Sequence, residues 1–389
     1  MAHSGIDLSL TDEQRDMQAL AHAFAERELR PIAPAVDEAD TVPQLDLVRK
    51  AAAVGLTSYM LPEAYGGGGI ESLVTDCVIV EELSWGDAGL CALITSGGFF
   101  ADPLIEIGSD EQRARYLSPL CSEDPPLTAL ATTEPDHGSD AAGMQMRAVR
   151  DGDGYRLNGQ KTWVSNGGVA QFYAVFAQLE PGSRSKGITA FVVHADDPGV
   201  SCGEPMRKLG DRGIVNTELF LDDVHVEADR RIGEEGQGFF GLMRTFDKSR
   251  IVLAASAVGL SRAAYEYAAQ YAREREQFGK PIIEHQAVGF RLADCAMRID
   301  AARLLAWRAA EAFDRGADVS AQAAMAKLYA SECAMFVTWA AVQTLGGWGY
   351  SREYPVEKWF RDAKLEEIWE GTSDIQRLII SRHIAKGSI

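Results

Sequence analysis

A chain of 389 residues is too long for one ordinary hydrophobic core, so two or three domains are expected. Hydrophobic residues make up 46% of the chain and charged residues 24%, a balance that is typical of a folded protein and excludes a disordered one. The net charge of −19 disfavours a nucleic-acid-binding protein, because such a protein needs a basic surface.

The N-terminal stretch Met1–Asp7 has neither a basic segment nor an apolar one, so no secretory signal is expected. The longest apolar runs, such as 251–260, are far shorter than the roughly 18 residues that suggest a membrane span, so no stable membrane insertion is expected. Six cysteines are scattered without a Cys-x-x-Cys pair, and the seven histidines form no ligand cluster. We therefore expect free thiols in a cytoplasmic protein without a bound metal.

The first segment, residues 1–128, is expected to form a helical domain. Two pairs of residues with capping-box spacing stand ahead of periodic apolar segments: Thr11 with Gln14, and Ser109 with Gln112. Prolines and glycines interrupt the helical pattern between them and mark the turns.

The residue pattern changes near residue 129, and residues 129–238 are expected to form a small antiparallel β domain. Short β-rich runs at 155–158, 188–193 and 215–221 are separated by Asp-Gly turn signals. Short strands joined by tight turns are typical of a meander or a barrel.

Helical periodicity returns in residues 239–389, which are expected to form a third domain. Apolar residues recur every three or four positions and form one stripe. Four helices in an antiparallel four-helix bundle are predicted at 240–275, 284–315, 319–345 and 373–386. The expected fold class is therefore α+β, with a helical domain, a β domain and a helical bundle in that order.

Two glycine-rich stretches resemble phosphate-binding loops and need another explanation. No Lys-Ser/Thr pair follows the four glycines at 66–69, so a turn is the better interpretation. The stretch 236–241 fits the spacing Gly-x-Gly-x-x-Gly, but the charged residues before it do not read as a strand. A glycine hinge at a domain boundary explains it better than a dinucleotide site.

The stretch 366–377 reads as a loop that enters a helix. Ser373 and Gln376 have capping-box spacing, which leaves Glu370 in the loop after the bulky Trp369. A carboxylate beside a large aromatic ring is poorly hydrated, which raises its pKa and makes it a better base. The alternative interpretation is an ordinary solvated loop glutamate.

Several motifs together give the chain a specific resemblance. They are Ala131–Asp140 with the sequence ATTEPDHGSD, Asn158–Gly168 with NGQKTWVSNGG, Arg273–Ile282 with REREQFGKPI, Gln343–Tyr350 with QTLGGWGY, Glu353–Lys358 with EYPVEK, and the loop around Glu370. In this order the chain resembles the acyl-CoA dehydrogenase family over nearly its whole length. The resemblance implies bound FAD and the same order of domains.

The resemblance also implies which residues contact FAD. They are Leu130, Thr133, Ser139, Trp163, Ser165, Arg275, Gln277, Phe278, Gln286, Gln343, Gly346, Gly347, Thr372 and Asp374. Taken singly, these residues have ordinary alternatives: a core tryptophan, a solvated cation at a helix end, a helix C-cap and a structural threonine. The guanidinium group of Arg275 can bind a pyrophosphate through two hydrogen bonds. Such a local cation is needed because the chain as a whole is acidic and repels an anionic ligand.

The same resemblance implies the substrate site and the chemistry. Glu370 would be the base that takes the α-proton of an acyl-CoA thioester, while the β-hydrogen leaves as hydride to flavin N5 and yields a trans-2-enoyl-CoA. A subgroup of the family carries its base on the helix next to the arginine; there this chain has Ser249, which cannot act as a base. The residues assigned to substrate contacts are Ser139, Asp247, Arg250, Trp369 and Gly371.

The implied partners are an acyl-CoA, an electron-transfer flavoprotein that accepts the electrons, and further copies of the chain in a tetramer built as a dimer of dimers. Three rival interpretations remain: an acyl-CoA oxidase, whose chains are generally longer; a nitroalkane-oxidising relative, which has Asp at the base position; and a DNA-associated alkylation-response homologue, which needs a basic face.

The acyl chain length is left open by the sequence. Phe99 and Phe100 occupy positions that line the acyl-tail pocket in the family, where with Trp369 they would favour a short or medium chain, but they are equally compatible with an ordinary helix core. His137 replaces a small residue in the flavin-side motif, and the effect of that change is also left open.

Overall fold

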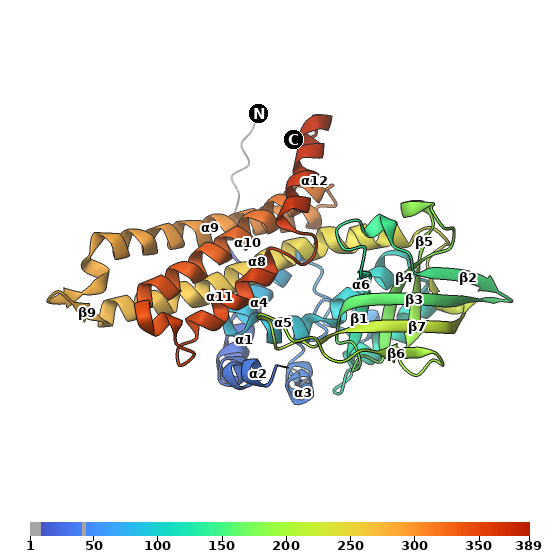
Figure 1. The fold of residues 1–389 in the computed structure, drawn as a ribbon, viewed down its shortest axis with the longest axis horizontal. Coiled ribbons are helices and arrows are strands. Elements are labelled where there is room, and N and C mark those ends of the chain that lie inside the picture. The colour runs from blue at the N-terminus through green and yellow to red at the C-terminus, as the bar shows by residue number, and fades with distance from the viewer. Residues whose placement is uncertain (1–8, 41–43) are drawn as a thin grey trace.

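The computed structural model describes residues 9–40 and 44–389, so the N-terminal stretch examined for a secretory signal lies outside the described residues. The chain forms an elongated molecule with a β-sheet at one end and a bundle of long helices that extends to the other (Figure 1). The shorter N-terminal helices pack against both parts. The predicted order of helices, sheet and helices is confirmed.

The N-terminal part is helical, as expected. Both capping boxes are formed, because the side chains of Thr11 and Gln14 and those of Ser109 and Gln112 exchange hydrogen bonds with each other's backbone N–H groups. The elements are α1 (Asp12–Phe24), a π-helical turn (Ala25–Leu29), α2 (Ala33–Ala39), α3 (Leu45–Ala53), a 3-10 turn (Glu63–Tyr65), α4 (Leu73–Gly86), α5 (Ala88–Thr95), α6 (Gly97–Ile107), α7 (Asp110–Leu117) and a 3-10 turn (Ser118–Cys121).

The helical stretch Ala88–Ile107 is long and apolar enough to cross a membrane, although the sequence suggested no such segment. Of its most apolar window, 67% is buried inside the protein. It therefore serves as a core segment of the folded chain.

The middle part is an eight-stranded sheet with strand order β6-β7-β3-β2-β4-β5-β8, while β1 pairs with β4. Most pairings are antiparallel, as predicted, but β1 and β2 both run parallel to β4, so the sheet is not a simple meander. The strands are β1 (Thr128–Ala131), β2 (Arg147–Asp151), β3 (Gly154–Ser165), β4 (Phe172–Gln178), β5 (Ile188–His194), β6 (Val200–Cys202), β7 (Asn216–Glu227) and β8 (Arg231–Ile232); three 3-10 turns lie at Ala141–Gly143, Arg184–Lys186 and Ala228–Arg230.

The C-terminal part contains the four predicted helices and one more, α11, which the sequence pattern did not reveal. A short hairpin of β9 and β10 joins α8 to α9 at the end of the molecule far from the sheet (Figure 1). The elements are α8 (Gly238–Glu274), β9 (Glu276–Gln277), β10 (Lys280–Pro281), a 3-10 turn (Ile282–Glu284), α9 (Gln286–Asp314), α10 (Ser320–Leu345), a 3-10 turn (Gly346–Tyr350), α11 (Val356–Glu366) and α12 (Ser373–Lys386).

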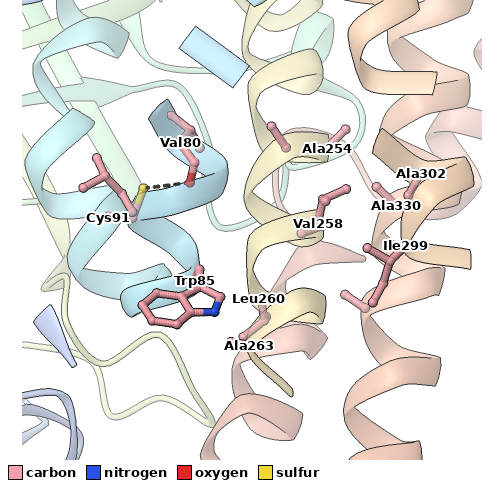
Figure 2. Close-up of a cluster of buried hydrophobic side chains, with 14 of the residues drawn as sticks. Val80, Trp85, Cys91, Ala254, Val258, Leu260, Ala263, Ile299, Ala302 and Ala330 are labelled. Carbon is pink, nitrogen blue, oxygen red and sulfur yellow. Dashed lines mark hydrogen bonds between the residues drawn. The ribbon is translucent and has the colours of Figure 1, made fainter. Parts of the chain in front are cut away.

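The largest core lies where α4 and α5 pack on α8, α9 and α10. Small side chains on the facing helices, such as Ala254, Ala302 and Ala330, let the backbones approach closely (Figure 2). Trp85 fills the space beside α8, and the thiol of Cys91 points to the carbonyl oxygen of Val80. This packing holds the middle of α8 rigidly, and the candidate base contacts α8 there.

The glycine-rich stretches have structural explanations. The run 66–69 forms a turn in which an added Cβ at Gly67 would lie 2.1 Å from the carbonyl oxygen of Leu61. At the start of α8, a Cβ on Gly238 would lie 2.7 Å from the Thr189 backbone, so close packing against β5 explains this glycine better than the predicted hinge. The preceding strand β8 pairs antiparallel with β5, which does not fit a dinucleotide-binding βαβ unit.

Candidate active site

The candidate base lies in the loop between α11 and α12, residues 367–372, which we call the base loop. Glu370 has φ +52° and Gly371 has φ +90°, so two consecutive residues adopt the left-handed conformation and turn the chain sharply. The cap of the next helix is Thr372, whose hydroxyl accepts a hydrogen bond from the backbone N–H of Ile375. The prediction that Ser373 forms this cap is wrong by one residue, because the left-handed turn brings the Thr372 hydroxyl to the helix start.

The carboxylate of Glu370 contacts the middle of α8. The Ser249 hydroxyl donates a hydrogen bond of 2.8 Å to Glu370 Oε2. Burial raises the pKa of the Glu370 carboxyl above its ordinary value, while this hydrogen bond and the charges of Arg250 and Lys327 partly offset that effect. Glu370 is therefore a poorly solvated carboxylate rather than an ordinary solvated loop glutamate.

The two carbonyl oxygens of the base loop are held by three side chains from three helices. Arg250 Nε of α8 donates to the Glu370 carbonyl over 3.1 Å. Gln376 Nε2 of α12 donates to the carbonyls of Glu370 (3.2 Å) and Gly371 (2.8 Å). Lys327 Nζ of α10 donates to the Gly371 carbonyl over 2.9 Å. The loop conformation is therefore fixed from several sides.

A second buried carboxylate lies at the end of α11, directly before the base loop. Glu366 is 1% exposed; its Oε2 accepts the indole N–H of Trp369 over 3.0 Å, and its Oε1 accepts the Ser256 hydroxyl over 3.3 Å. Burial raises the pKa of Glu366 to about 7. Trp369 is thus anchored by its nitrogen.

The loop that carries Thr133 is tied to strand β3 by a buried ion pair. Lys161 Nζ lies 2.8 Å from Glu134 Oε1 and 3.0 Å from the carbonyl oxygen of Thr132. Burial alone would raise the pKa of the Glu134 carboxyl, but the Lys161 ammonium and two backbone N–H donors lower it below its ordinary value. The Thr133 carbonyl accepts the N–H of Thr162 over 2.8 Å, which brings Thr133 beside the next predicted flavin contact.

Trp163 lies at the end of β3 in a left-handed backbone conformation with φ +57° and is 58% exposed. The alternative of a core tryptophan is therefore wrong, and the ring is available to a ligand. Asn216 of β7 donates to the Ser165 hydroxyl (3.1 Å) and to the Trp163 carbonyl (3.3 Å), so the two predicted residues share one support.

The remaining predicted residues near the sheet and the base differ in their surroundings. Ser139 is exposed in the loop after β1, whereas Leu130 on β1 is half-buried. Thr372 and Asp374 stand at the start of α12, close to Glu370 in the chain. Asp247 pairs with Arg250 over 3.1 Å on α8.

The other predicted FAD contacts lie at the opposite end of the bundle. Arg275 caps the C-terminal end of α8, 26 residues beyond Ser249, which corresponds to about 39 Å along one continuous helix. Because α10 runs back beside α9, its end returns to this region. The predicted residues here are all exposed: Arg275, Gln277, Phe278, Gln286, Gln343, Gly346 and Gly347. They do not meet the base of the same chain.

The structure separates the two phenylalanines proposed for the acyl pocket. Phe100 is fully buried between α6 and the sheet, where its ring lies 6.1 Å from that of Phe172 and 6.3 Å from that of Tyr116. It is a core residue, so Phe99, which is half-buried, remains as the candidate of this pair for the acyl pocket. His137 closes a tight turn in which its backbone exchanges two hydrogen bonds of 3.1 Å with Glu134.

Some residues of the site were not predicted from the sequence. Lys161 and Glu134 stand inside motifs that were singled out, but their pairing across 27 residues was missed. Lys327 was missed too, and Gln376 was predicted only as a capping-box residue, whereas both support the base loop. A lone lysine in the alanine-rich stretch 323–330 was the available signal, since such a stretch is typical of a buried helix face.

Comparison with known protein families assigns nearly the whole chain. The model of the acyl-CoA dehydrogenase N-terminal domain matches residues 11–124, that of the middle domain matches 129–224, and that of the C-terminal domain matches 236–385. An acyl-CoA dehydrogenase of Bacillus subtilis is 39% identical over 384 residues, which cover 98% of this chain and 100% of the relative.

Solved structures give the same answer. Butyryl-CoA dehydrogenase from Megasphaera elsdenii superposes with a TM-score of 0.94 at 38% identity, covering 98% of this chain and all of that one. A chain in a structure of the electron transferring flavoprotein of Acidaminococcus fermentans has a TM-score of 0.94 at 38% identity, covering 97% and 99% of the two chains. PigA, solved with FAD and proline, has a TM-score of 0.93 at 30% identity, covering 98% and 99%.

These matches define a three-domain flavoprotein dehydrogenase. The chain belongs to the acyl-CoA dehydrogenase family, and its activity is the flavin-dependent dehydrogenation of acyl-CoA. Its cofactor is FAD. The structure fits this cofactor: Trp163 presents an exposed ring, and an added Cβ at Gly346 or Gly347 would meet nothing within 4 Å, which leaves room for a close ligand.

Proposed function

We propose that Glu370 is the base that removes the α-proton of a bound acyl-CoA, giving a trans-2-enoyl-CoA. The observation that carries this proposal is the left-handed loop in which Glu370 is supported by α8, α10 and α12 while burial raises the pKa of its carboxyl. A base whose pKa is raised toward the working pH takes a proton more effectively.

The backbone of the same residue supports the second requirement of the reaction, a donor for the developing enolate oxygen. Among the described residues, no hydrogen bond occupies the backbone N–H of Glu370. A fixed N–H donor stabilises charge that develops on a thioester oxygen. When bound, FAD supplies the hydride-accepting chemistry, and the residues of this chain orient the substrate and hold the proton at the Glu370 carboxylate.

The test is single-turnover flavin reduction without oxygen in the wild type and in Glu370→Gln. Removal of a positioned base lowers the rate by about 10²–10⁴-fold. The matched control is Glu367→Gln, three residues earlier, whose carboxylate pairs with Lys364 at 2.6 Å and should leave the rate near that of the wild type. Both variants should retain FAD; reduction of Glu370→Gln within a few-fold of the wild type would refute the assignment.

We further propose that each FAD is held between two copies of the chain in a tetramer built as a dimer of dimers. The predicted contacts fall into two groups separated by about 39 Å along α8, which is too far for one dinucleotide to contact both groups of a single chain. Exposed apolar side chains at the far end, among them Phe278, Phe290 and Met297, suit contacts with another copy. A stable FAD-loaded monomer in sedimentation would contradict this arrangement.

The electrons leave the reduced flavin to an acceptor, for which we propose an electron-transfer flavoprotein. The similarity to a chain from such a system in Acidaminococcus fermentans supports this choice. The six cysteines are free, which agrees with the proposed cytoplasmic location. Reoxidation by the purified flavoprotein at least tenfold faster than by oxygen is expected, and equal rates would favour an oxidase.

For the substrate we propose a short- or medium-chain acyl-CoA. The similarity to a butyryl-CoA dehydrogenase supports a short chain, and Phe99 and Trp369 are the residues left to crowd the tail pocket now that Phe100 is a core residue. Each excess methylene group in a filled cavity lowers affinity, since overpacking costs about 1–3 kcal/mol. A maximum of kcat/KM at palmitoyl-CoA or longer would contradict this proposal.

A further inference from the structure

The base loop is held by side chains from three different helices. Its two successive carbonyl oxygens, those of Glu370 and Gly371, receive four hydrogen bonds from Arg250, Gln376 and Lys327. Arg250, Gln376 and Lys327 come from α8, α12 and α10 respectively, and all three are at most 5% exposed.

We propose that Lys327 and Gln376 are positioning residues that hold Glu370 in the left-handed conformation needed for proton abstraction. Both donate to the Gly371 carbonyl, and Gln376 also reaches the Glu370 carbonyl. This inference rests on the proposed role of Glu370 as the base and adds the groups that set its geometry.

The backbone explains why such support is needed. A residue with a side chain at φ +52° is less stable than in an ordinary conformation, so Glu370 remains there only if its surroundings favour that state. The Glu370 carbonyl accepts from Arg250 and Gln376, and the Gly371 carbonyl accepts from Gln376 and Lys327, so the two peptide groups that follow the Glu370 Cα are both held. Rotation of these peptide groups would change the backbone conformation of Glu370 and move its carboxylate.

The charges around the loop come from several elements. Glu370 faces Ser249 and Arg250 of α8, Lys327 of α10 and, at longer range, Asp102 of α6. Burial lowers the pKa of Lys327 to about 8. The charges of Glu366 and Glu370 raise this pKa, and the charge of Arg250 lowers it further. Lys327 is therefore mostly charged at neutral pH and lowers the pKa of Glu370, whereas Gln376 acts without charge.

Two variants separate the hydrogen bond from the charge. Lys327→Met removes a donor and a cation, and Gln376→Met removes two neutral hydrogen bonds at nearly constant side-chain length. The matched control is Lys358→Met, a buried lysine of α11 that pairs with Asp87 (2.5 Å) and Asp362 (2.7 Å) and does not contact the loop carbonyls. It reports what loss of a buried lysine does to stability alone.

The first measurement is amide hydrogen exchange of the FAD-loaded enzyme over residues 368–373. The Ser373 N–H closes this loop by donating to the Glu367 carbonyl over 3.0 Å, so its exchange reports loop opening. Exchange should rise about three- to tenfold in Lys327→Met and in Gln376→Met. In Lys358→Met it should stay at the wild-type rate while the melting temperature falls.

The second measurement is the rate of flavin reduction at saturating butyryl-CoA, with the dissociation constant of the acyl-CoA measured separately. Misplacement of the base should lower the rate about 10–100-fold in both loop variants while binding changes little. Only Lys327→Met should also move the acidic limb of the pH profile to higher pH, because the pKa of Glu370 rises when the nearby cation is removed.

Wild-type exchange in both loop variants, or a fall in melting temperature alone as in the control, would overturn the proposal. Failure of the proposed function is a separate result: fast flavin reduction in Glu370→Gln would remove the base assignment, while the exchange data would still decide whether Lys327 and Gln376 hold the loop. If Lys327→Met does not fold, Gln376→Met by itself decides between the outcomes.

Discussion

Two regions of α8, one near its middle and one at its C-terminal end, differ in how much of a site one chain completes. Near its middle, Ser249 and Arg250 contact a base loop in which the carboxylate and both loop carbonyls already have partners. At its C-terminal end, Arg275 and Phe278 are exposed, and Phe278 is 94% accessible to solvent. The loop of the proposed base is supported within one chain, whereas the far end presents exposed groups that we propose to contact FAD and a second copy.

The difference shows how polar groups in the two regions obtain their hydrogen-bond partners. A buried polar group without a partner is costly, so the base loop must satisfy its carbonyl oxygens within the chain. Exposed groups at the far end are solvated by water and need no internal partner. Substitutions at the base loop should therefore change the geometry and the pKa of Glu370. Substitutions at the C-terminal end of α8 should change ligand binding and assembly.

The largest expected effect comes from the buried ion pair that ties the Thr133 loop to β3. Lys161→Met leaves the Glu134 carboxylate buried without its cation, which should cost about 3–5 kcal/mol of stability. Thermal unfolding of the FAD-loaded protein should show a midpoint several degrees lower. Arg49→Met breaks only exposed ion pairs and should change stability by less than about 0.5 kcal/mol.

The same variant has a pH signature. In the wild type the pKa of Glu134 is lowered, so its stabilising contribution is present at neutral pH and is lost as the pH falls. Without Lys161 the buried carboxyl prefers its protonated form, so the variant loses stability as the pH rises. The deficit of Lys161→Met should therefore be smaller at pH 5 than at pH 8, and an equal deficit at both values would argue against the ion pair.

The second prediction addresses the far end of α8. Arg275→Ala should weaken FAD binding about 10–100-fold, because a hydrogen bond to a charged phosphate contributes about 1.5–3 kcal/mol. Titration of the apoprotein with FAD measures it. Arg273→Ala is the control and should bind FAD normally, because among the described residues its side chain is bonded only to Gln270. Equal losses in both variants would show a general charge effect.

The third prediction concerns assembly. Phe278→Ser should raise the dissociation constant of the oligomer about 10–100-fold, because burying a phenylalanine contributes about 1.5–3 kcal/mol, while the fold of the separate chain is unchanged. Sedimentation velocity over a range of concentrations measures it. Val149→Ser, an exposed apolar residue of β2, is the control. Unchanged assembly of Phe278→Ser would leave the exposed far end without its proposed partner.

The smallest effect is expected at Glu370, the proposed base. Ser249→Ala removes the hydrogen bond that lowers the pKa of Glu370, so the pKa rises further and the acidic limb of the flavin-reduction profile moves to higher pH. The rate should fall several-fold at pH 6 and change little at pH 8. Ser249→Thr keeps the hydroxyl and should retain the wild-type profile; an unshifted profile in Ser249→Ala would show that the contact is unimportant.

Much of the architecture followed from local patterns. The capping boxes at Thr11 and Ser109 and the long periodic helices were predicted because their signals lie within a few residues of each other. The missed helix α11 follows a stretch rich in glycine and aromatic residues, where the helical pattern is short. The parallel pairing of β1 and β2 with β4 was missed because strand order depends on contacts between distant segments.

The sequence by itself determined the motif that contains Glu370, the order of the domains and the exclusion of a base at Ser249. Only the tertiary structure decided that Ser249 contacts Glu370 from 121 positions away, that Lys327 supports Gly371, and that Phe100 belongs to the core. The reason is physical: periodicity shows which face of a helix is buried, but not which helix it faces. The contacts that set the pKa and the geometry of Glu370 cross between helices, so they exist only once the helices have packed.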